Sequence, residues 1–453
     1  MGGYLPNPAS IGLVKAVAYS APEEWRPDRR AAHVEERRQS WRLPYDTFGP
    51  QSSIPWLREL PEYYAMLHPD ELTRRSPGRL VRVQEGAWAF VPGPLPPRLD
   101  VDAKLLRRTE IAARELGHLA GMARSLPNPH LLIRPFMSRE AVLSSKIEGS
   151  QATLSDLLIL EATPAKGTAE AREVSDYVRA LDFGLDRART RPVALNLILE
   201  IHDIVMQQSS GAAAGQFRKV QNWIGPPGSK ITEATYVPPP VPDMHAALHA
   251  LEKFIHADSD LPLLIRLAAI HYQFEAIHPF IDGNGRVGRL LLTLLLCTEE
   301  ALPHPLLYLS EFFERHRRDY HDLLLQVSRQ GAWNDWIDFF LVGVSEQARD
   351  ASARAVKLQD LRTRLHEKFH AARSPALLLK LIDELFTSPY ITFGRAQRVL
   401  GITPRGAGLN VLKLEDAGVL RRVPKTSRPI LFVAPKILEL ISAPASQSGN
   451  VAR

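Results

Sequence analysis

Apolar residues recur at spacings of three and four through most of residues 101–351, in stretches separated by polar, Gly and Pro residues. This spacing places the apolar side chains on one face of a helix, so it predicts a mainly α-helical region. The stretches with the clearest pattern are AARELGHLAGMARSL, SREAVLSSKIEG, ALNLILEIHDIVMQ, DMHAALHALEKFIHA, PLLIRLAAIHYQFEAI, RLLLTLLLCTEE, SEFFERHRRDYHDLLLQVS and WNDWIDFFLVGVSEQARDA.

Two segments depart from helical spacing. Residues 81–92, VRVQEGAWAFVP, predict two short strands followed by a Pro-rich connection. Residues 217–240 place β-branched and aromatic residues around a Gly/Pro turn and end in three prolines. That pattern predicts a β-hairpin inserted into the helical region.

The C-terminal part has a different pattern. SPALLLKLIDELF, TFGRAQRVLGI and TPRGAGLNVLKLEDAGVL predict three helices, with Thr392 and Thr403 as N-caps, and RRVPKTSRPILFVAP predicts two strands around a wing. Together they predict a winged helix-turn-helix. Its positive charges suit contacts to DNA phosphates, but Glu415 and Asp416 weaken the basic face, so docking to a protein or dimerisation stays equally open. The basic residues are Arg405, Lys413, Arg421, Arg422, Lys425 and Arg428.

Composition narrows the class of protein. The chain has 453 residues, of which 45% are hydrophobic and 23% charged, which is ordinary for a globular protein and excludes a fibre, wholesale disorder or a membrane bundle. The single cysteine, Cys297, excludes an intrachain disulfide, so we expect a cytoplasmic protein with no membrane partner. The net charge of +6 permits binding to a polyanion without favouring it.

The segment HPFIDGNGRVGR at residues 278–289 combines glycines with the start of an apolar helix. Gly283 and Gly285 flank Asn284, so the backbone can turn tightly and bring its N–H groups close to a ligand. The apolar residues 290–297 then continue a buried helix, whose N-terminus favours anions. The segment therefore predicts a phosphate-binding turn.

Charged side chains in this segment complete a reactive site. Arg286 and Arg289 lie three residues apart and can both reach a polyphosphate. Asp282 can hold a divalent cation on the same phosphates, and His278 is a candidate base near neutral pH.

These residues resemble the core motif of the Fic family, His-x-Phe-x-Asp/Glu-Gly-Asn-Gly-Arg-x-x-Arg, at every defined position. The resemblance implies a Fic-type helical core and transfer of AMP from ATP to a Tyr, Ser or Thr hydroxyl of a target protein or of the protein itself. It implies that His278 is the base, that Phe280 anchors the loop and that Asp282 binds Mg²⁺. A phosphotransferase branch of the family carries Lys at the position of Gly285, so this glycine favours AMP transfer. The nucleotide-binding residues implied by the motif are Gly283, Asn284, Gly285, Arg286, Val287, Gly288 and Arg289.

An upstream segment resembles the inhibitory motif of the same family, Ser/Thr-x-x-x-Glu-Gly/Asn. Ser144 and Glu148 lie four residues apart on a predicted helix, and Gly149 allows the helix to end there. The resemblance implies that Glu148 pairs with Arg289 and occupies the γ-phosphate position. An exposed Glu beside an ordinary helix end is the alternative.

The resemblance implies two further sites, one that binds the target protein and one that lies beside the adenine of the nucleotide. The family's flap binds the target as an added strand, and the matching residues here are Ile231, Thr232, Tyr236 and Val237, although a hairpin without a ligand is also possible. Tyr320 and His321 fall where relatives often have a Tyr-Tyr pair beside the nucleotide. Because His321 departs from that pattern, a surface histidine is an equal alternative. Trp333, Trp336, Phe339 and Phe340 are interpreted as core residues.

The sequence thus predicts six regions and one main function. The function is an autoinhibited, Mg²⁺-dependent protein adenylyltransferase, and the competing hypothesis is a nucleotide-sensing DNA-binding regulator with little turnover. Homodimerisation is left open. The regions are a loosely ordered extension (1–80), a Fic N-terminal segment with the inhibitory helix (81–165), the catalytic core (166–350), a connecting helix (351–373), the winged helix (374–440) and a polar tail (441–453).

Overall fold

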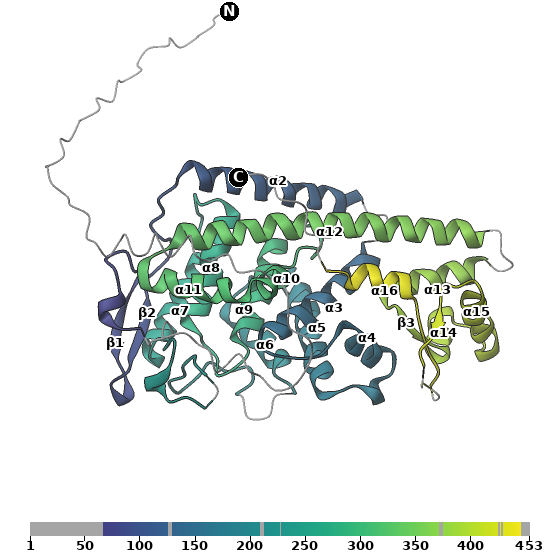
Figure 1. The fold of residues 1–453 in the computed structure, drawn as a ribbon, viewed down its shortest axis with the longest axis horizontal. Coiled ribbons are helices and arrows are strands. Elements are labelled where there is room, and N and C mark those ends of the chain that lie inside the picture. Colours follow the sequence, from purple (N-terminus) through teal and green to yellow (C-terminus); the bar gives the residue numbers. More distant parts are fainter. Residues whose placement is uncertain are drawn as a thin grey trace, which may run out of the picture. The chain divides into compact units, whose positions relative to one another are not determined.

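The computed structural model describes residues 67–125, 129–208, 213–226, 228–370, 375–424, 426 and 429–444 (Figure 1). Most of the predicted extension, most of the polar tail, and Lys425 and Arg428 of the predicted wing lie outside the described residues. The helices are α2 (Ala103–Ser125), α3 (His130–Ile147), α4 (Leu154–Ala162), α5 (Ala169–Ala188), α6 (Leu195–Val205), α7 (Val241–His256), α8 (Leu263–Ile277), α9 (Asn284–Thr298), α10 (Ser310–Arg315), α11 (Arg317–Gln330), α12 (Trp333–His370), α13 (Pro375–Thr387), α14 (Phe393–Leu400), α15 (Pro404–Asp416) and α16 (Pro435–Ser442). The strands are β1 (Gly78–Arg82), β2 (Trp88–Pro92), β3 (Tyr390–Thr392), β4 (Arg421–Arg422) and β5 (Leu431–Val433).

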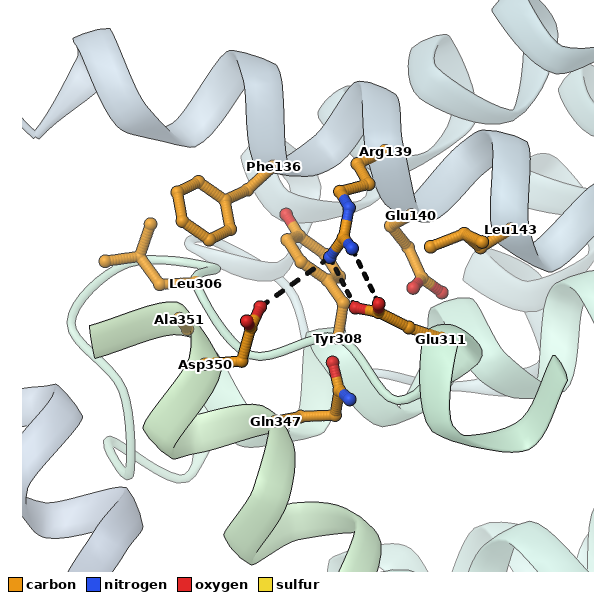
Figure 2. A pocket seen from close by; sticks show the side chains of 10 residues that line it. All are labelled: Phe136, Arg139, Glu140, Leu143, Leu306, Tyr308, Glu311, Gln347, Asp350 and Ala351. Carbon is orange, nitrogen blue, oxygen red and sulfur yellow. Dashed lines mark hydrogen bonds and ion pairs between the residues drawn. The ribbon is translucent and has the colours of Figure 1, made fainter. Parts of the chain in front are cut away.

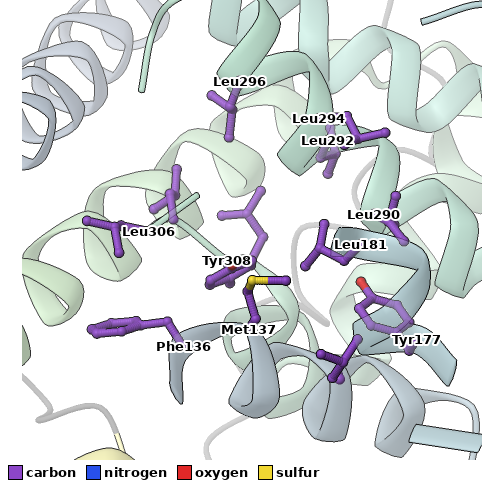
Figure 3. Packing of buried hydrophobic residues seen from close by; sticks show 14 of the residues in the cluster. Phe136, Met137, Tyr177, Leu181, Leu290, Leu292, Leu294, Leu296, Leu306 and Tyr308 are labelled. Atoms are coloured by element: carbon purple, nitrogen blue, oxygen red, sulfur yellow. The ribbon is translucent and has the colours of Figure 1, made fainter. Parts of the chain in front are cut away.

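Helix α9 lies at the centre of the helical core because its sequence is apolar on every face. It packs against α3, α5, α6 and α8, and its leucines from Leu290 to Leu296 are buried. Figure 3 shows these leucines beside Met137 of α3 and Leu181 of α5. The phosphate-binding turn predicted just before α9 is therefore fixed to a helix that is buried along most of its length.

The two strands predicted in residues 81–92 are present. β1 and β2 pair in antiparallel fashion, with Gly78 opposite Pro92 and Arg82 opposite Trp88. β2 packs against α7 and α8, which places this small sheet on the same side of the core as the C-terminal end of α8.

Helix α12 is longer than the sequence predicted, since it continues to His370, through most of the connecting helix or linker proposed at 351–373. Apolar residues keep helical spacing beyond residue 351 without Pro or Gly, so the helix has no reason to end there. Figure 1 shows α12 running beside α2, with which it packs. The core interpretation of Trp333, Trp336 and Phe340 agrees with their burial.

Other helices differ from prediction in their boundaries. The predicted helix at 310–328 divides into α10 and α11 at His316, whose φ of −113° and ψ of 36° are not helical. Helices α4 and α5 were not predicted, because charged residues obscure the apolar face of α5. No helix in the described ranges combines the length and the apolar character needed to cross a bilayer.

The predicted β-hairpin at 217–240 is reduced to one bridge, between Ile224 and Tyr236. A short 3-10 turn, η4 (Ile231–Glu233), occupies the predicted return strand. Pro226 and the prolines that begin at Pro238 have no N–H to donate, which limits the pairing. We call residues 217–240 the flap segment.

The C-terminal module, residues 375–444, has the predicted order of elements with an added strand, β3, and an added helix, α16. Its three-stranded antiparallel sheet has the order β3-β5-β4. Thr392 and Thr403 cap α14 and α15 as predicted, by accepting hydrogen bonds from backbone N–H groups three residues ahead. Arg422 pairs with Glu415 at 2.9 Å, which removes it from the basic face, so DNA binding stays a prediction.

Candidate active site

His278 is held at the C-terminal end of α8 in a left-handed conformation. Its φ of 48° and ψ of 62° are uncommon for a residue with a Cβ, and its N–H donates to the carbonyl of Phe274 at 3.0 Å. Its Nδ1 lies 3.3 Å from the carbonyl oxygen of Glu275. Since a carbonyl only accepts, Nδ1 carries the proton and Nε2 keeps a lone pair. Burial lowers the pKa of His278 to about 4, so the ring is neutral at pH 7 and can act as a base.

Arg218, in the flap segment, fixes this strained turn. Its Nε donates to the carbonyl of His278 at 3.0 Å, and its backbone N–H donates to the carbonyl of Pro279 at 2.9 Å. The other guanidinium nitrogens donate to the carbonyls of Val220 and Pro239. Arg218 is 1% exposed, and burial lowers its pKa to about 10. It therefore ties the loop that carries His278 to both ends of the flap segment.

Phe280 anchors the loop to the core, as the resemblance implied. It is fully buried and stacks on His202 with ring centroids 3.7 Å apart and planes within 4°. The N–H of Gly215 donates to Nδ1 of His202, so Nε2 is the protonated nitrogen and donates to the carbonyl of Asp282 at 3.0 Å. Burial lowers the pKa of His202 and keeps this ring neutral.

Asn284 has a structural role that differs from the nucleotide contact implied for its side chain. It is 2% exposed, its Oδ1 accepts from the N–H of Phe280 at 2.8 Å, and its Nδ2 donates to the carbonyl of Phe280 at 2.9 Å. Gly283 precedes it with a φ of 81°, and a Cβ there would lie 2.8 Å from the sulfur of Met206. The turn needs a glycine for both reasons.

Arg289 joins α9 to the end of α3. It is 3% exposed, and it donates from Nε to Oγ of Ser144 at 2.9 Å and from Nη2 to the carbonyl of Ser144 at 3.0 Å. The same Nη2 pairs with Oε1 of Glu148 at 2.7 Å. Burial alone would lower the pKa of Arg289, but Glu148 and other neighbours raise it above its usual value. Ser144, Glu148 and Arg289, the three residues of the predicted inhibitory contact, thus lie together.

The carboxylate of Glu148 lies directly over the first turn of α9. A Cβ added at Gly285 would approach Oε1 of Glu148 to 2.2 Å. α3 ends at Ile147, and Gly149 follows with a φ of 102°, so the chain turns away and leaves Glu148 at the tip of the helix. Burial opposes the ionisation of Glu148, but Arg289 outweighs it and the pKa lies below its usual value. An anionic group therefore occupies the N-terminus of α9.

Asp282 and Arg286 lie on the outer side of the same turn. Oδ1 of Asp282 accepts from the N–H of Gly283 at 2.6 Å, and Oδ2 lies 3.5 Å from Nη2 of Arg286. The side chain of Asp282 is 60% exposed, so it can reach a cation that phosphates also bind. No cluster of three metal-ligating side chains occurs among the described residues, which fits Mg²⁺ held mainly by phosphates and water with one carboxylate.

Val287 and Gly288 face the protein interior. Val287 is 1% exposed. A Cβ at Gly288 would lie 2.6 Å from Oε1 of Glu275 on α8, so this glycine allows the two helices to approach closely. Burial raises the pKa of Glu275 to about 7. Neither motif residue directs a side chain toward a nucleotide.

Tyr320 is a core residue, in contrast to the adenine contact implied for it. It is 1% exposed, its hydroxyl lies 2.8 Å from Nε2 of His271, and its ring stacks on Phe313 at 4.5 Å. His321 is exposed and sits close enough to Glu148 to interact with it electrostatically. Of this pair, only His321 is open to a ligand.

The flap residues named from the resemblance are mostly turned inward. Ile231, Tyr236 and Val237 are buried, and the hydroxyl of Tyr236 donates to the carbonyl of Ala276 at 2.8 Å. The carbonyl of Val237 already accepts from the N–H of Phe90 in β2. Thr232 is exposed. The outward apolar side chains near His278 are instead Val220, Trp223, Ile224 and Ile281.

Comparison with known proteins agrees with this geometry. Residues 106–186 match the family model described as Fic/DOC family N-terminal, and residues 192–296 match the Fic/DOC family model. This chain therefore contains a region that is similar to the Fic/DOC family. The Fic model covers His278, the turn before α9 and most of α9 itself.

Relatives and a solved structure extend the comparison. Protein adenylyltransferase Fic of Nematostella vectensis is 30% identical over 193 residues, which cover 41% of this chain and 42% of that protein. The protein of the same name from Culex quinquefasciatus is 32% identical over 149 residues, covering 32% and 27%. The chain thus matches less than half the length of these relatives. A Fic family protein from Desulfovibrio desulfuricans G20 shares the fold, with a TM-score of 0.50 at 18% identity over 75% of this chain and 98% of that one.

Sequence reasoning missed two residues that position the Fic loop. His202 lies on the buried face of α6 with Ile198, Ile201 and Val205, and a histidine in an apolar stripe was the available signal. Arg218 had no such signal, since a buried arginine whose partners are backbone carbonyls leaves no pattern in the sequence.

Proposed function

We propose that this protein transfers AMP from ATP to a hydroxyl side chain of a target protein, and to itself, and that Glu148 restrains the reaction. The observation that carries the proposal is the placement of an anion-binding helix N-terminus beside a neutral histidine. The curated relatives named protein adenylyltransferase support the same reaction. Because they are matched over less than half their length, the activity is an inference for this chain.

The residues have separable roles in this reaction. Nε2 of His278 takes the proton of the hydroxyl that attacks the α-phosphorus of ATP, and pyrophosphate leaves as the bond between the α- and β-phosphates breaks. Nδ1–H stays on the carbonyl of Glu275. The N–H groups that begin α9, together with Arg286 and Arg289, bind the phosphates and the negative charge that develops on them. Asp282 fits as the carboxylate that holds Mg²⁺, and this ion would neutralise the phosphate charge when bound.

Inhibition by Glu148, which we call the brake, follows from competition between its carboxylate and the terminal phosphate of ATP for the guanidinium of Arg289. Arg289 has Nε and Nη2 engaged by Ser144 and Glu148, so the terminal phosphate of ATP cannot also pair there. The side chain of Glu148 is 41% exposed and lies at a helix end, so it can rotate away without disturbing the core. The enzyme is then active only in the fraction of molecules in which Arg289 is free.

The experiment is intact-mass analysis of the full chain after incubation with ATP and Mg²⁺. Wild-type protein should gain little mass, and Glu148→Gly should gain AMP at least about tenfold faster, because Arg289 becomes available. Glu148→Gln, which keeps the size of the side chain, should gain AMP at a rate between those of the wild type and Glu148→Gly. Adding Arg289→Ala to Glu148→Gly should cancel the gain.

Two results would count against the proposal in different ways. No AMP on any variant, with ATP bound normally in calorimetry, would remove the transferase assignment and favour the nucleotide-sensing regulator. Equal rates in wild type and Glu148→Gly would keep the transferase but remove the brake. A candidate target, once found, is tested in the same assay.

A further inference from the structure

The C-terminal module packs on the helix that carries Glu148. Within the C-terminal module, α13 and α16 contact α3, and β3 contacts α4. The inhibitory helix therefore lies between Arg289 at its C-terminal end and the C-terminal module along its earlier turns.

Two arginines cap the C-terminal end of α16. The last carbonyls of a helix have no partner within it and carry partial negative charge, so cations stabilise them. Arg354 of α12 donates to the carbonyls of Leu440, Ile441 and Ala443, the last at 3.0 Å. Arg139 of α3 donates to the carbonyl of Ala443 at 2.9 Å. The end of the C-terminal module is thereby fastened to α12 and to α3.

Arg139 is also the centre of a buried charge network. It forms a two-point pair with Glu311 of α10 and lies 3.8 Å from Asp350, which in turn pairs with Arg354. Its side chain is 13% exposed. Figure 2 shows its guanidinium between these two carboxylates, in a small pocket lined by α3, α10 and α12.

The pocket contains polar atoms without partners. Oε2 of Glu140, the hydroxyl of Tyr308 and Nε2 of Gln347 are buried, and within the described residues none of the three has a hydrogen-bond partner. Buried polar atoms without a hydrogen-bond partner are unfavourable, so a rearrangement of the pocket that gave these three atoms partners would lower the free energy. Among the contacts of the described residues in this pocket, the hydrogen bond of Arg139 to Ala443 joins α3 to the end of α16.

Arg139 and Glu148 are connected by uninterrupted helix. α3 contains a proline at Pro135, but it lies before Arg139, and no Gly or Pro follows until the helix ends. Nine residues of helix separate Arg139 from Glu148, about 14 Å along the axis. On one face, Glu140 accepts from Ser310 and Tyr177, and one turn later Ser144 accepts from Arg289. A shift of the helix at Arg139 therefore reaches Glu148.

We propose that Arg139 is a positioning residue of the brake: by joining the carbonyl of Ala443, at the end of α16, to α3, it holds Glu148 against Arg289. The inference rests on the proposed function, because it gives that brake a second point of control. A ligand that draws α16 away from Arg139 loosens α3 and raises the fraction of molecules with Arg289 free. The C-terminal module then acts as part of the inhibitory apparatus.

The test compares two arginines of the same helix in the full-length chain. Arg139→Gln should raise the rate of AMP incorporation about fivefold, because α3 loses its contact to Ala443 and Glu311. Arg134→Gln is the matched control, since Arg134 pairs only with Glu161 and Asp182 of α4 and α5 among the described residues, and it should leave the rate unchanged. In the Glu148→Gly background, Arg139→Gln should add nothing. Arg139→Lys, which keeps the charge but loses the two-point pair, is the second variant if the Gln variant does not fold.

A second measurement does not depend on catalysis. Hydrogen exchange of the amides at 144–149 should be faster in Arg139→Gln than in wild type and unchanged in Arg134→Gln. Unchanged exchange and rate in a folded Arg139 variant would overturn the inference, as would an equal rate increase in the Glu148→Gly background. If no variant transfers AMP but exchange still changes as expected, the proposed function fails while the mechanical link stands.

Discussion

The loop that carries His278 and the flap segment beside it differ in how their side chains are placed, since buried side chains anchor the loop whereas several apolar side chains of the flap segment are exposed. In the loop, Phe280 and Asn284 point inward, and the buried amide of Asn284 bonds both backbone groups of Phe280, whose carbonyl also accepts from Asn222. In the flap segment, one β-bridge pairs the two arms, and Val220, Trp223 and Ile224 keep between 41% and 61% of their surface exposed. The first region is fixed by its core, whereas the second presents its apolar side chains to solvent.

This difference separates chemistry from recognition. A base and a phosphate cradle must be in place before the reaction, because reorganising them during it would raise the barrier. A surface for a protein target gains from exposed apolar groups that a partner can cover. Ile281, 44% exposed, lies within the loop itself, next to Phe280, whose carbonyl accepts a hydrogen bond from Asn222 of the flap segment.

The largest effect is expected from His278→Ala. Removing the base should lower the transfer rate about a hundredfold to ten-thousandfold, while ATP binding stays nearly unchanged because His278 does not contact phosphates. Radiolabelled AMP incorporation and calorimetry with ATP measure the two quantities. His118→Ala, an exposed histidine on α2, is the control and should retain full activity. Parallel loss of binding and turnover would contradict the role of a base.

Asp282→Ala should reduce transfer roughly a hundredfold at limiting Mg²⁺ by removing the proposed metal ligand. Excess Mg²⁺ should restore part of the rate, since phosphates still bind the ion. Metal titrations of the rate for wild type, Asp282→Ala and Asp282→Asn measure this. Superimposable titration curves would show that the carboxylate does not hold the ion.

Asn284→Ala should destabilise the loop by about 2 kcal/mol, because the buried N–H of Phe280 loses its partner, while the carbonyl of Phe280 keeps only the hydrogen bond from Asn222 among the described residues. The transfer rate should fall about tenfold as His278 loses its fixed position. Thermal unfolding and initial rates measure both effects. A variant with wild-type melting temperature would mean that the backbone of Phe280 finds other partners.

The smallest effect is expected from Trp223→Ala in the flap segment. Stability should change by no more than about 0.5 kcal/mol, since the side chain is 42% exposed. Transfer to a protein target should fall about threefold through weaker binding of the target, with ATP binding unaffected. Leu106→Ala, at a residue of α2 that is 60% exposed, should change neither. A large loss of stability would remove the contrast between the two regions.

The sequence predicted the loop better than the flap segment for a physical reason. The loop depends on residues that are adjacent in the chain, so its glycines, His278 and Arg289 can be found by spacing alone. The contacts of Ser144 and Glu148 with Arg289 join residues more than 140 positions apart, and only the family resemblance indicated them. The inward positions of Tyr320 and Tyr236 could not be predicted, because they depend on packing against α8.

The contacts of Arg218 have a consequence for how this fold can change over time. Among the described residues its guanidinium binds carbonyl oxygens, at Val220, Pro239 and His278, and every amino acid supplies a carbonyl. The exposed side chains of the flap segment, such as Val220, Trp223 and Thr232, can therefore be exchanged without removing the contacts of Arg218 to the turn at His278. A designer could therefore replace exposed residues of the flap segment around Arg218, and natural variants can acquire new targets in the same way, while the residues that carry out the reaction stay unchanged.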